Sequence, residues 1–176
     1  MTFKVETICA IASAIGQSGI GIVRVSGPLA KSISKIILKT DLNPRYAYYG
    51  AFYDAKSIVI DQGVAIFFPG PNSYTGEDIV EFQGHGGASV LRKILGIILD
   101  LDVRLAEPGE FSKRAFLNGK MDLVQAEAVQ DLIQSNSEES ALSAVRSLTG
   151  EFSEKINEIL SELVSLRVFI EATIDF

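Results

Sequence analysis

Two charged residues, Arg24 and Glu81, stand in the middle of short segments that are otherwise mostly apolar. The two-residue period of a β-strand places Arg24 on one face with Ile22, and Glu81 on one face with Ile79 and Gln83. A charge buried at such a position without a partner is strongly destabilising. Two interpretations follow: the charges form a mutual salt bridge or occupy an exposed edge, or they bind a polar ligand between them.

Two glycine-rich segments suggest phosphate binding but lack the residues that it requires. After the glycines of residues 16–21, Arg24 stands where the dinucleotide fingerprint needs glycine, and the segment leads into an expected strand rather than a helix. Around the Gly-Lys pair at 119–120, Arg114 replaces the first P-loop glycine and Met121 replaces the Ser or Thr. Both segments are interpreted as turns, and no nucleotide triphosphate motif is recognisable.

The sequence contains one histidine, His85, and one cysteine, Cys9. This excludes a disulfide framework and a Cys/His zinc site within one chain. His85 lies among glycines and is interpreted as a turn residue, whereas Cys9 lies in an apolar segment and is assigned to the core. We therefore predict no catalytic residue and no metal ligand.

The elements that must position Arg24 and Glu81 are short strands and helices that alternate along residues 1–118. Apolar alternation and turn residues predict this order, which indicates an α+β fold with a compact mixed-sheet domain. Strands are expected over 5–12, 19–26, 46–53, 58–68 and 78–83, and helices over 28–39, 90–99 and 108–117.

The chain changes in composition near residue 118. All five prolines and 13 of the 15 glycines precede that point, and the net charge is +1 over residues 1–118 but −7 over 119–176. We predict two domains, 1–118 and 119–176.

The acidic balance argues against a protein that coats nucleic acid. No apolar run approaches the roughly 18 residues of a membrane span, and no export signal is convincing, so a cytoplasmic location is expected.

Residues 119–176 carry only helical signals. Asp122 and Gln125 form a capping pattern that opens a helix to about residue 134, and Ser135 with Glu138 repeats it. Apolar residues then recur every three or four positions from 141 to 170, which predicts one helix of about 50 Å despite Gly150. This apolar stripe is expected to pack against other helices or a second chain. The abrupt end at Phe176 indicates a fragment of a longer protein.

Several long motifs in this sequence resemble the N-terminal part of the MnmE (TrmE) family of tRNA modification GTPases. The motif that contains Arg24 reads Gly-Ile-Gly-Ile-Val-Arg-Val-Ser-Gly, and the motif around Glu81 reads Val-Glu-Phe-Gln-Gly-His-Gly-Gly. Small departures from the family pattern occur at Gln17 and Ser18, in the first glycine loop, and at Ala88. The matching segments are residues 19–27, 68–78, 80–87, 108–120, 122–128 and 171–176.

The resemblance implies a tetrahydrofolate-binding, dimerising N-terminal domain, followed by a helical domain into which a GTPase domain is inserted. A 5-formyltetrahydrofolate or related folate would contact Arg24, Glu81 and Lys120. The family acts with the flavoprotein MnmG to build an aminomethyl-type group on the wobble uridine of tRNA, and it uses GTP, Mg²⁺ and K⁺. On this interpretation the chain ends before the GTPase domain, binds the one-carbon donor, forms a homodimer and does not hydrolyse GTP.

Two alternatives from other functional classes stay open at this point. One is a stand-alone folate-dependent one-carbon transferase, which turnover of a bound one-carbon unit would favour. The other is a structural dimerisation module, which a failure to bind folate would favour.

Overall fold

The computed structural model describes residues 6–14 and 16–174 of the chain. They form two compact units, of which the first ends at Lys120 and the second begins at Met121. The first unit contains a sheet with three helices, and the second contains only helices. The predicted α+β class with a mixed sheet followed by a helical segment is therefore confirmed.

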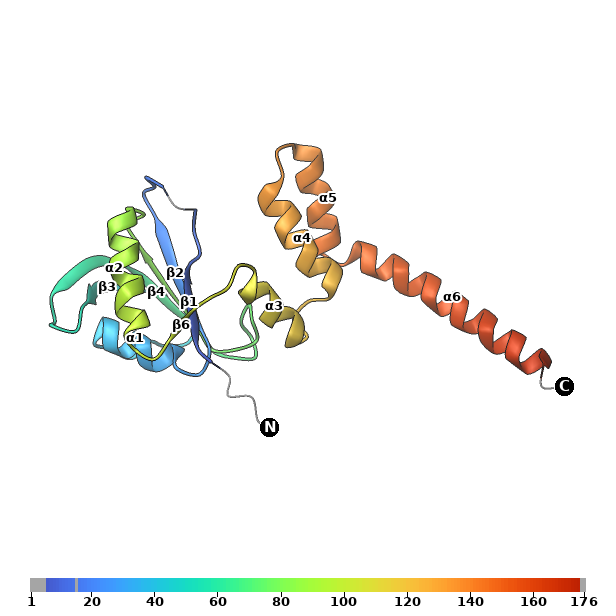
Figure 1. Cartoon of the computed structure of the whole chain (residues 1–176), viewed down its shortest axis with the longest axis horizontal. Helices are drawn as coiled ribbons and strands as arrows, with labels where there is room; N and C mark the ends of the chain where they lie inside the picture. Colours follow the sequence, from blue (N-terminus) through green and yellow to red (C-terminus); the bar gives the residue numbers. More distant parts are fainter. Residues whose placement is uncertain (1–5, 15, 175–176) are drawn as a thin grey trace. The chain divides into compact units, whose positions relative to one another are not determined.

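The sheet of the first unit has six strands in the order β3-β4-β5-β2-β1-β6 (Figure 1). All neighbouring strands are antiparallel except β1 and β6, which are parallel. The sequence predicted the first five strands but missed β6, because a two-residue strand has no alternation to detect. The strands are β1 (Ile8–Ile11), β2 (Gly21–Ser26), β3 (Tyr48–Tyr53), β4 (Val59–Phe68), β5 (Ile79–Gly84) and β6 (Arg104–Leu105).

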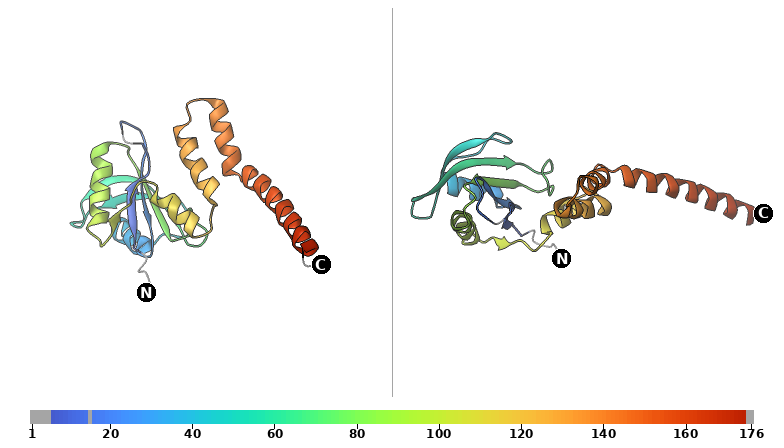
Figure 2. Two further views of the ribbon diagram at one scale, coloured as in Figure 1. Left: turned by 45° about the vertical axis from the view of Figure 1, so that its right-hand side comes forward. Right: turned by 90° about the horizontal axis from the view of Figure 1, so that it is seen from above.

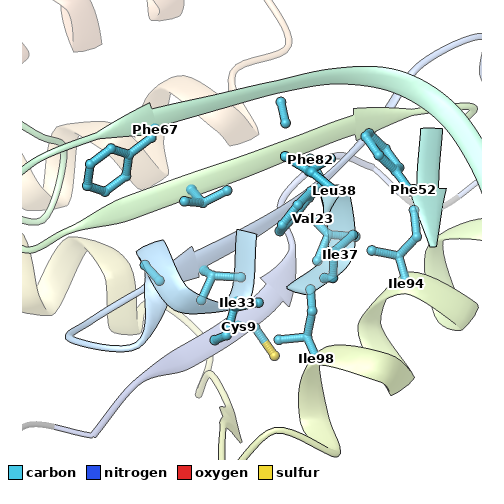
Figure 3. Packing of buried hydrophobic residues seen from close by; sticks show 14 of the residues in the cluster. Cys9, Val23, Ile33, Ile37, Leu38, Phe52, Phe67, Phe82, Ile94 and Ile98 are labelled. Carbon is cyan, nitrogen blue, oxygen red and sulfur yellow. The ribbon is translucent and has the colours of Figure 1, made fainter. Parts of the chain in front are cut away.

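Helices α1 (Ala30–Leu38) and α2 (Ala88–Leu99) pack on one face of this sheet and close a single hydrophobic core. Figure 3 shows Ile37 of α1 beside Val23 of β2, and Ile94 of α2 beside Phe52 of β3. Phe82 of β5 belongs to the same core. Because residues that alternate along a strand share a face, the charged residues next to Val23 and Phe82 must lie on the other face.

The second face of the sheet is covered at one end and open at the other. Ser26, Ile79 and Ile8 lie opposite one another across β1, β2 and β5, and they are fully buried. Ile22, Val64 and Gln83 form a row across β2, β5 and β4 on the same face, and they are only half-buried. Arg24 and Glu81 lie in the row between these two. The open end of this face is therefore the part of the sheet that is accessible to a ligand.

The second unit contains three helices, α4 (Leu123–Gln134), α5 (Glu138–Leu148) and α6 (Glu151–Ile174). Helices α4 and α5 run side by side as a hairpin (Figure 2). The predicted cap at Asp122 is confirmed. The Asp122 side chain accepts a hydrogen bond from the Gln125 backbone N–H, and the Gln125 side chain accepts one from the Asp122 backbone N–H. Helix α6 buries none of its residues, and all of its large apolar side chains are exposed, among them Phe152, Leu163 and Phe169.

Two predictions for this unit were wrong. The single long helix is divided into α5 and α6 at Gly150, whose φ of 92° lies in the left-handed region. Such a backbone ends a helix, so the glycine acts as a terminator instead of a tolerated interruption. The second capping residue is Ser137, paired with Ser140, while Ser135 ends α4. The apolar spacing of three and four residues continues across Gly150, because both helices contain apolar residues at helical spacing.

Within the described part of the chain, no helix combines the length and the apolar character that a membrane span requires.

Candidate functional site

Arg24 and Glu81 form a salt bridge at the centre of the sheet. They are directly paired across β2 and β5, and both strands lie inside the sheet, so the exposed-edge interpretation is excluded. Arg24 Nε donates to Glu81 Oε1 at 2.8 Å, and Nη2 lies 2.8 Å from the same oxygen. Their side chains are 24% and 14% exposed. The mutual salt bridge is confirmed, and its partial exposure leaves room for contact with a ligand.

The second oxygen of Glu81 is much less engaged than the first. Among the described residues its hydrogen bond comes from Gln83 Nε2 at 3.4 Å, near the limit for such a bond. A carboxylate oxygen can accept two hydrogen bonds, so Glu81 Oε2 retains acceptor capacity. Ile22 and Val64 flank Gln83 in the neighbouring row and provide an apolar floor. A flat ring with adjacent N–H donors fits this combination of acceptor and apolar surface.

Two aromatic rings pack against the Arg24 guanidinium. Its central carbon lies 5.1 Å from the ring centroid of Tyr74 and 5.4 Å from that of Phe111. Tyr74 belongs to the loop between β4 and β5, whereas Phe111 belongs to α3 (Glu110–Leu117). The Tyr74 hydroxyl and the Ser112 hydroxyl share a hydrogen bond of 2.8 Å, which joins the loop to the helix.

Lys120 lies beside the same loop, and within the described residues no hydrogen bond or ion pair joins its side chain to Glu81. Its backbone N–H donates to the Ala115 carbonyl at the end of α3. Gly76, with a φ of 80°, packs so closely that an added Cβ would lie 3.4 Å from Lys120 Cγ and Cδ and 3.1 Å from Asn118 Cβ. Asn118 Nδ2 also donates to the Thr75 carbonyl at 2.7 Å. The loop of residues 69–78 therefore contacts both Arg24, through Tyr74, and Lys120, through Gly76.

A cluster of four charged side chains fixes α3 to the covered end of the sheet face. Arg104 donates twice to Glu110, at 2.7 and 2.9 Å, and Arg114 donates to both Glu110 and Glu77 at 3.0 Å. Glu110 is 8% exposed. The hydrogen bonds from Arg104, aided by the Glu107 N–H and Arg114, outweigh burial and lower the pKa of Glu110 to about 2.

Hydroxyl groups extend this cluster to β2. The buried Ser26 hydroxyl donates to Glu77 Oε2 at 2.7 Å and lies 2.7 Å from the Thr75 hydroxyl. Ser26 is two residues from Arg24 on the same face, while Thr75 follows Tyr74 directly. The polar network thus anchors the loop against the strand that carries Arg24.

His85 forms a close pair with Asp61 on the other side of the sheet. Its Nδ1 lies 2.7 Å from Asp61 Oδ1, and its backbone N–H donates to Asp61 Oδ2 at 2.8 Å. Burial alone would raise the pKa of Asp61, but the hydrogen bonds from His85 and the Gln62 N–H hold that pKa below its ordinary value. Asp61 shares the face of Ala65 and Phe67 in the core, opposite to Glu81. This pair fixes the turn before α2, in agreement with the interpretation of His85 as a turn residue.

Among residues 6–14 and 16–174, no three His, Cys, Asp or Glu side chains are grouped so that they could hold a metal ion. Sequence reasoning identified Arg24 and Glu81 as a pair, but it missed Tyr74, Phe111 and the ionic cluster. The spacing between Tyr74 and Phe111 carries no periodic signal, because their proximity arises only when the loop and α3 fold onto the sheet.

Comparison with known proteins identifies relatives over the whole chain. The family model described as the N-terminus of the GTP-binding protein TrmE matches residues 7–120, and the model of the MnmE helical domain matches residues 123–176. A tRNA modification GTPase MnmE from Vesicomyosocius okutanii is 59% identical over 176 residues, which are 100% of this chain and 39% of that relative. The proteins of the same name from Ruthia magnifica and Ectopseudomonas mendocina are 58% and 53% identical, over 100% and 97% of this chain and 39% and 38% of their own lengths. The chain therefore belongs to the MnmE (TrmE) family of tRNA modification GTPases and corresponds to its N-terminal part.

Proposed function

We propose that the first unit binds a reduced folate, 5-formyltetrahydrofolate or a close relative, on the open end of the sheet face. The observation that supports this most directly is the Arg24–Glu81 pair, which offers a carboxylate oxygen with spare acceptor capacity beside an apolar floor. Binding would position the one-carbon unit of the folate, which is the chemistry that this ligand supplies. Arg24, Glu81 and Lys120 are the proposed contacts.

The chemical groups of a folate match the side chains in kind. A pterin ring presents a ring N–H and an amino group side by side, and a carboxylate such as Glu81 can accept from both. The folate tail ends in carboxylates at the far end of the molecule from the pterin, so Lys120 is the cation proposed for them, while Arg24, which is bonded to Glu81, would contact the pterin end. Because Glu81 Oε1 is already engaged by Arg24, ligand binding would draw mainly on Oε2.

The wider function belongs to a longer protein than this chain. The chain spans about 39% of the length of its relatives, whose name describes tRNA modification and GTPase activity. We propose that the full-length protein forms a cytoplasmic homodimer through the first unit and hydrolyses GTP with Mg²⁺ and K⁺. With MnmG, it would build an aminomethyl-type group on the wobble uridine of tRNA. The apolar side of α6 would then pack against later helices of the same protein.

Calorimetric titration with 5-formyltetrahydrofolate tests the proposed site. We expect wild-type protein to bind and Glu81→Gln to bind at least tenfold more weakly, because an amide that keeps its oxygen on Arg24 places an N–H donor where Oε2 would accept from the ligand. Glu107→Gln is the matched control, since Glu107 is an exposed glutamate of the same unit. Equal affinity of Glu81→Gln and wild type would refute the assignment of Glu81.

Light scattering on the same samples tests the dimer. A dimer that binds no folate would point to a structural module, and release of a converted one-carbon unit by this chain alone would point to a stand-alone transferase.

A further inference from the structure

We infer that Tyr74 and Phe111 are positioning residues for the proposed folate site, and that they act by holding the Arg24 guanidinium in place. This inference rests on the proposed function. Both rings lie within 5.4 Å of the central guanidinium carbon, inside the range of a cation–π interaction. Neither residue is needed to complete the Arg24–Glu81 salt bridge itself.

Arg24 needs such support because its bond to Glu81 is made to a single oxygen. Nε and Nη2 both approach Oε1, so the pair lacks the two parallel bonds that fix a guanidinium against a carboxylate. An arginine held at one oxygen keeps freedom to swing about that contact. Aromatic rings packed against the guanidinium restrict its motion already in the folded protein. Ligand binding then carries no further entropy cost for ordering Arg24.

The two rings are themselves held together by contacts between their elements. The Tyr74 hydroxyl bonds to Ser112, the residue after Phe111, and Arg114 of the same helix bonds to Glu77 of the loop. These contacts fix the loop of residues 69–78 and α3 as one support on one side of Arg24. The remaining nitrogen, Nη1, has no hydrogen bond within the described residues, and it is the donor that this support would present to an acceptor atom of the ligand.

The test compares folate affinity in Tyr74→Leu, Phe111→Leu and Tyr74→Phe by calorimetry, with thermal melting as the check on folding. We expect each leucine variant to bind 5-formyltetrahydrofolate roughly 3- to 30-fold more weakly, the range of one partly desolvated cation–π contact. Tyr74→Phe keeps the ring and should restore most of the affinity. Phe116→Leu is the matched control, because Phe116 lies on the same helix but is 40% exposed.

A double-variant measurement separates positioning from general structural support. If the rings act through Arg24, Tyr74→Leu should have little further effect in an Arg24→Gln background. A loss of the same size in both backgrounds would overturn the inference, and so would unchanged affinity of both leucine variants. Wild-type protein that binds no folate would instead refute the proposed function, and the inference with it.

If a leucine variant fails to fold, fluorinated phenylalanine at position 111 supplies the same test without a change of shape. Fluorine withdraws charge from the ring face, so affinity should fall in steps as fluorine atoms are added. Affinity that stays constant across this series would overturn the role of Phe111.

Discussion

Arg24 and Glu81 face each other across two inner strands, with Arg24 Nη2 2.8 Å from Glu81 Oε1, on the sheet face that the core helices leave uncovered. The pair is neither fully buried nor freely solvated, because loop residue Tyr74 and helix residue Phe111 cover part of it. In this intermediate environment the pair can contribute to stability while it stays partly accessible to solvent.

A double-mutant cycle should measure that contribution. For Arg24→Gln, Glu81→Gln and the combined variant, we expect a coupling free energy of about 1–2 kcal/mol in chemical unfolding, above the usual value of an exposed pair. Lys35 and Asp41, an exposed pair at 2.8 Å, provide the comparison and should couple by less than about 0.5 kcal/mol. Equal coupling in the two pairs would contradict the special environment of Arg24.

Glu110 should make stability depend on acid pH. Its hydrogen bonds with Arg104 lower the folded-state pKa to about 2 from an ordinary value of 4.5, so the unfolded chain takes up a proton first as pH falls. The resulting stability is present above about pH 5 and is lost toward pH 2, by roughly 2–4 kcal/mol. Unfolding free energies of wild type and Glu110→Gln should therefore converge across this range. Parallel curves would show that Glu110 is not the group responsible.

The same substitution at two glycines should have opposite effects. Gly150→Ala places a side chain at a φ of 92° and should destabilise the second unit by about 1–2 kcal/mol. Gly96→Ala lies inside α2 with no atom within 4 Å of the added Cβ, and it should stabilise the first unit by about 0.5–1 kcal/mol. Hydrogen exchange resolves the two units separately. Stabilisation by Gly150→Ala would mean that the helices merge there instead of ending.

Cys9 should be inert in the folded protein. The thiol is fully buried, and burial raises its pKa to about 12. At pH 8 a thiol reagent should therefore label the folded chain only through unfolding. Because Cys9 is the sole cysteine, the labelling rate reports on the stability of the first unit. Rapid labelling in the absence of denaturant would contradict the packing of β1 against α2.

Local patterns in the sequence predicted most of the elements well. Alternating apolar residues located β2 and β5 and placed Arg24 and Glu81 at their centres, because the side-chain period of a strand is fixed by its backbone. Capping residues located the start of α4 at Asp122 for a similar local reason. The motifs also carried the resemblance to the MnmE (TrmE) family, which the comparisons confirm.

Local patterns failed where a backbone angle overrode them. Apolar residues on both sides of Gly150 suggested a continuous helix, since periodicity does not register a single left-handed residue. The two-residue strand β6 was missed because it exists only through its pairing with β1.

Within one chain, the sequence by itself determined that Arg24 and Glu81 are charges on strands, and that each needs a partner. Only the tertiary structure decided that they are each other's partners, that Tyr74 and Phe111 pack against Arg24, and that Lys120 is held beside the same loop. The physical reason is distance along the chain. Strand order, loop position and the place of α3 depend on packing between segments that are tens of residues apart, and no local period records such contacts.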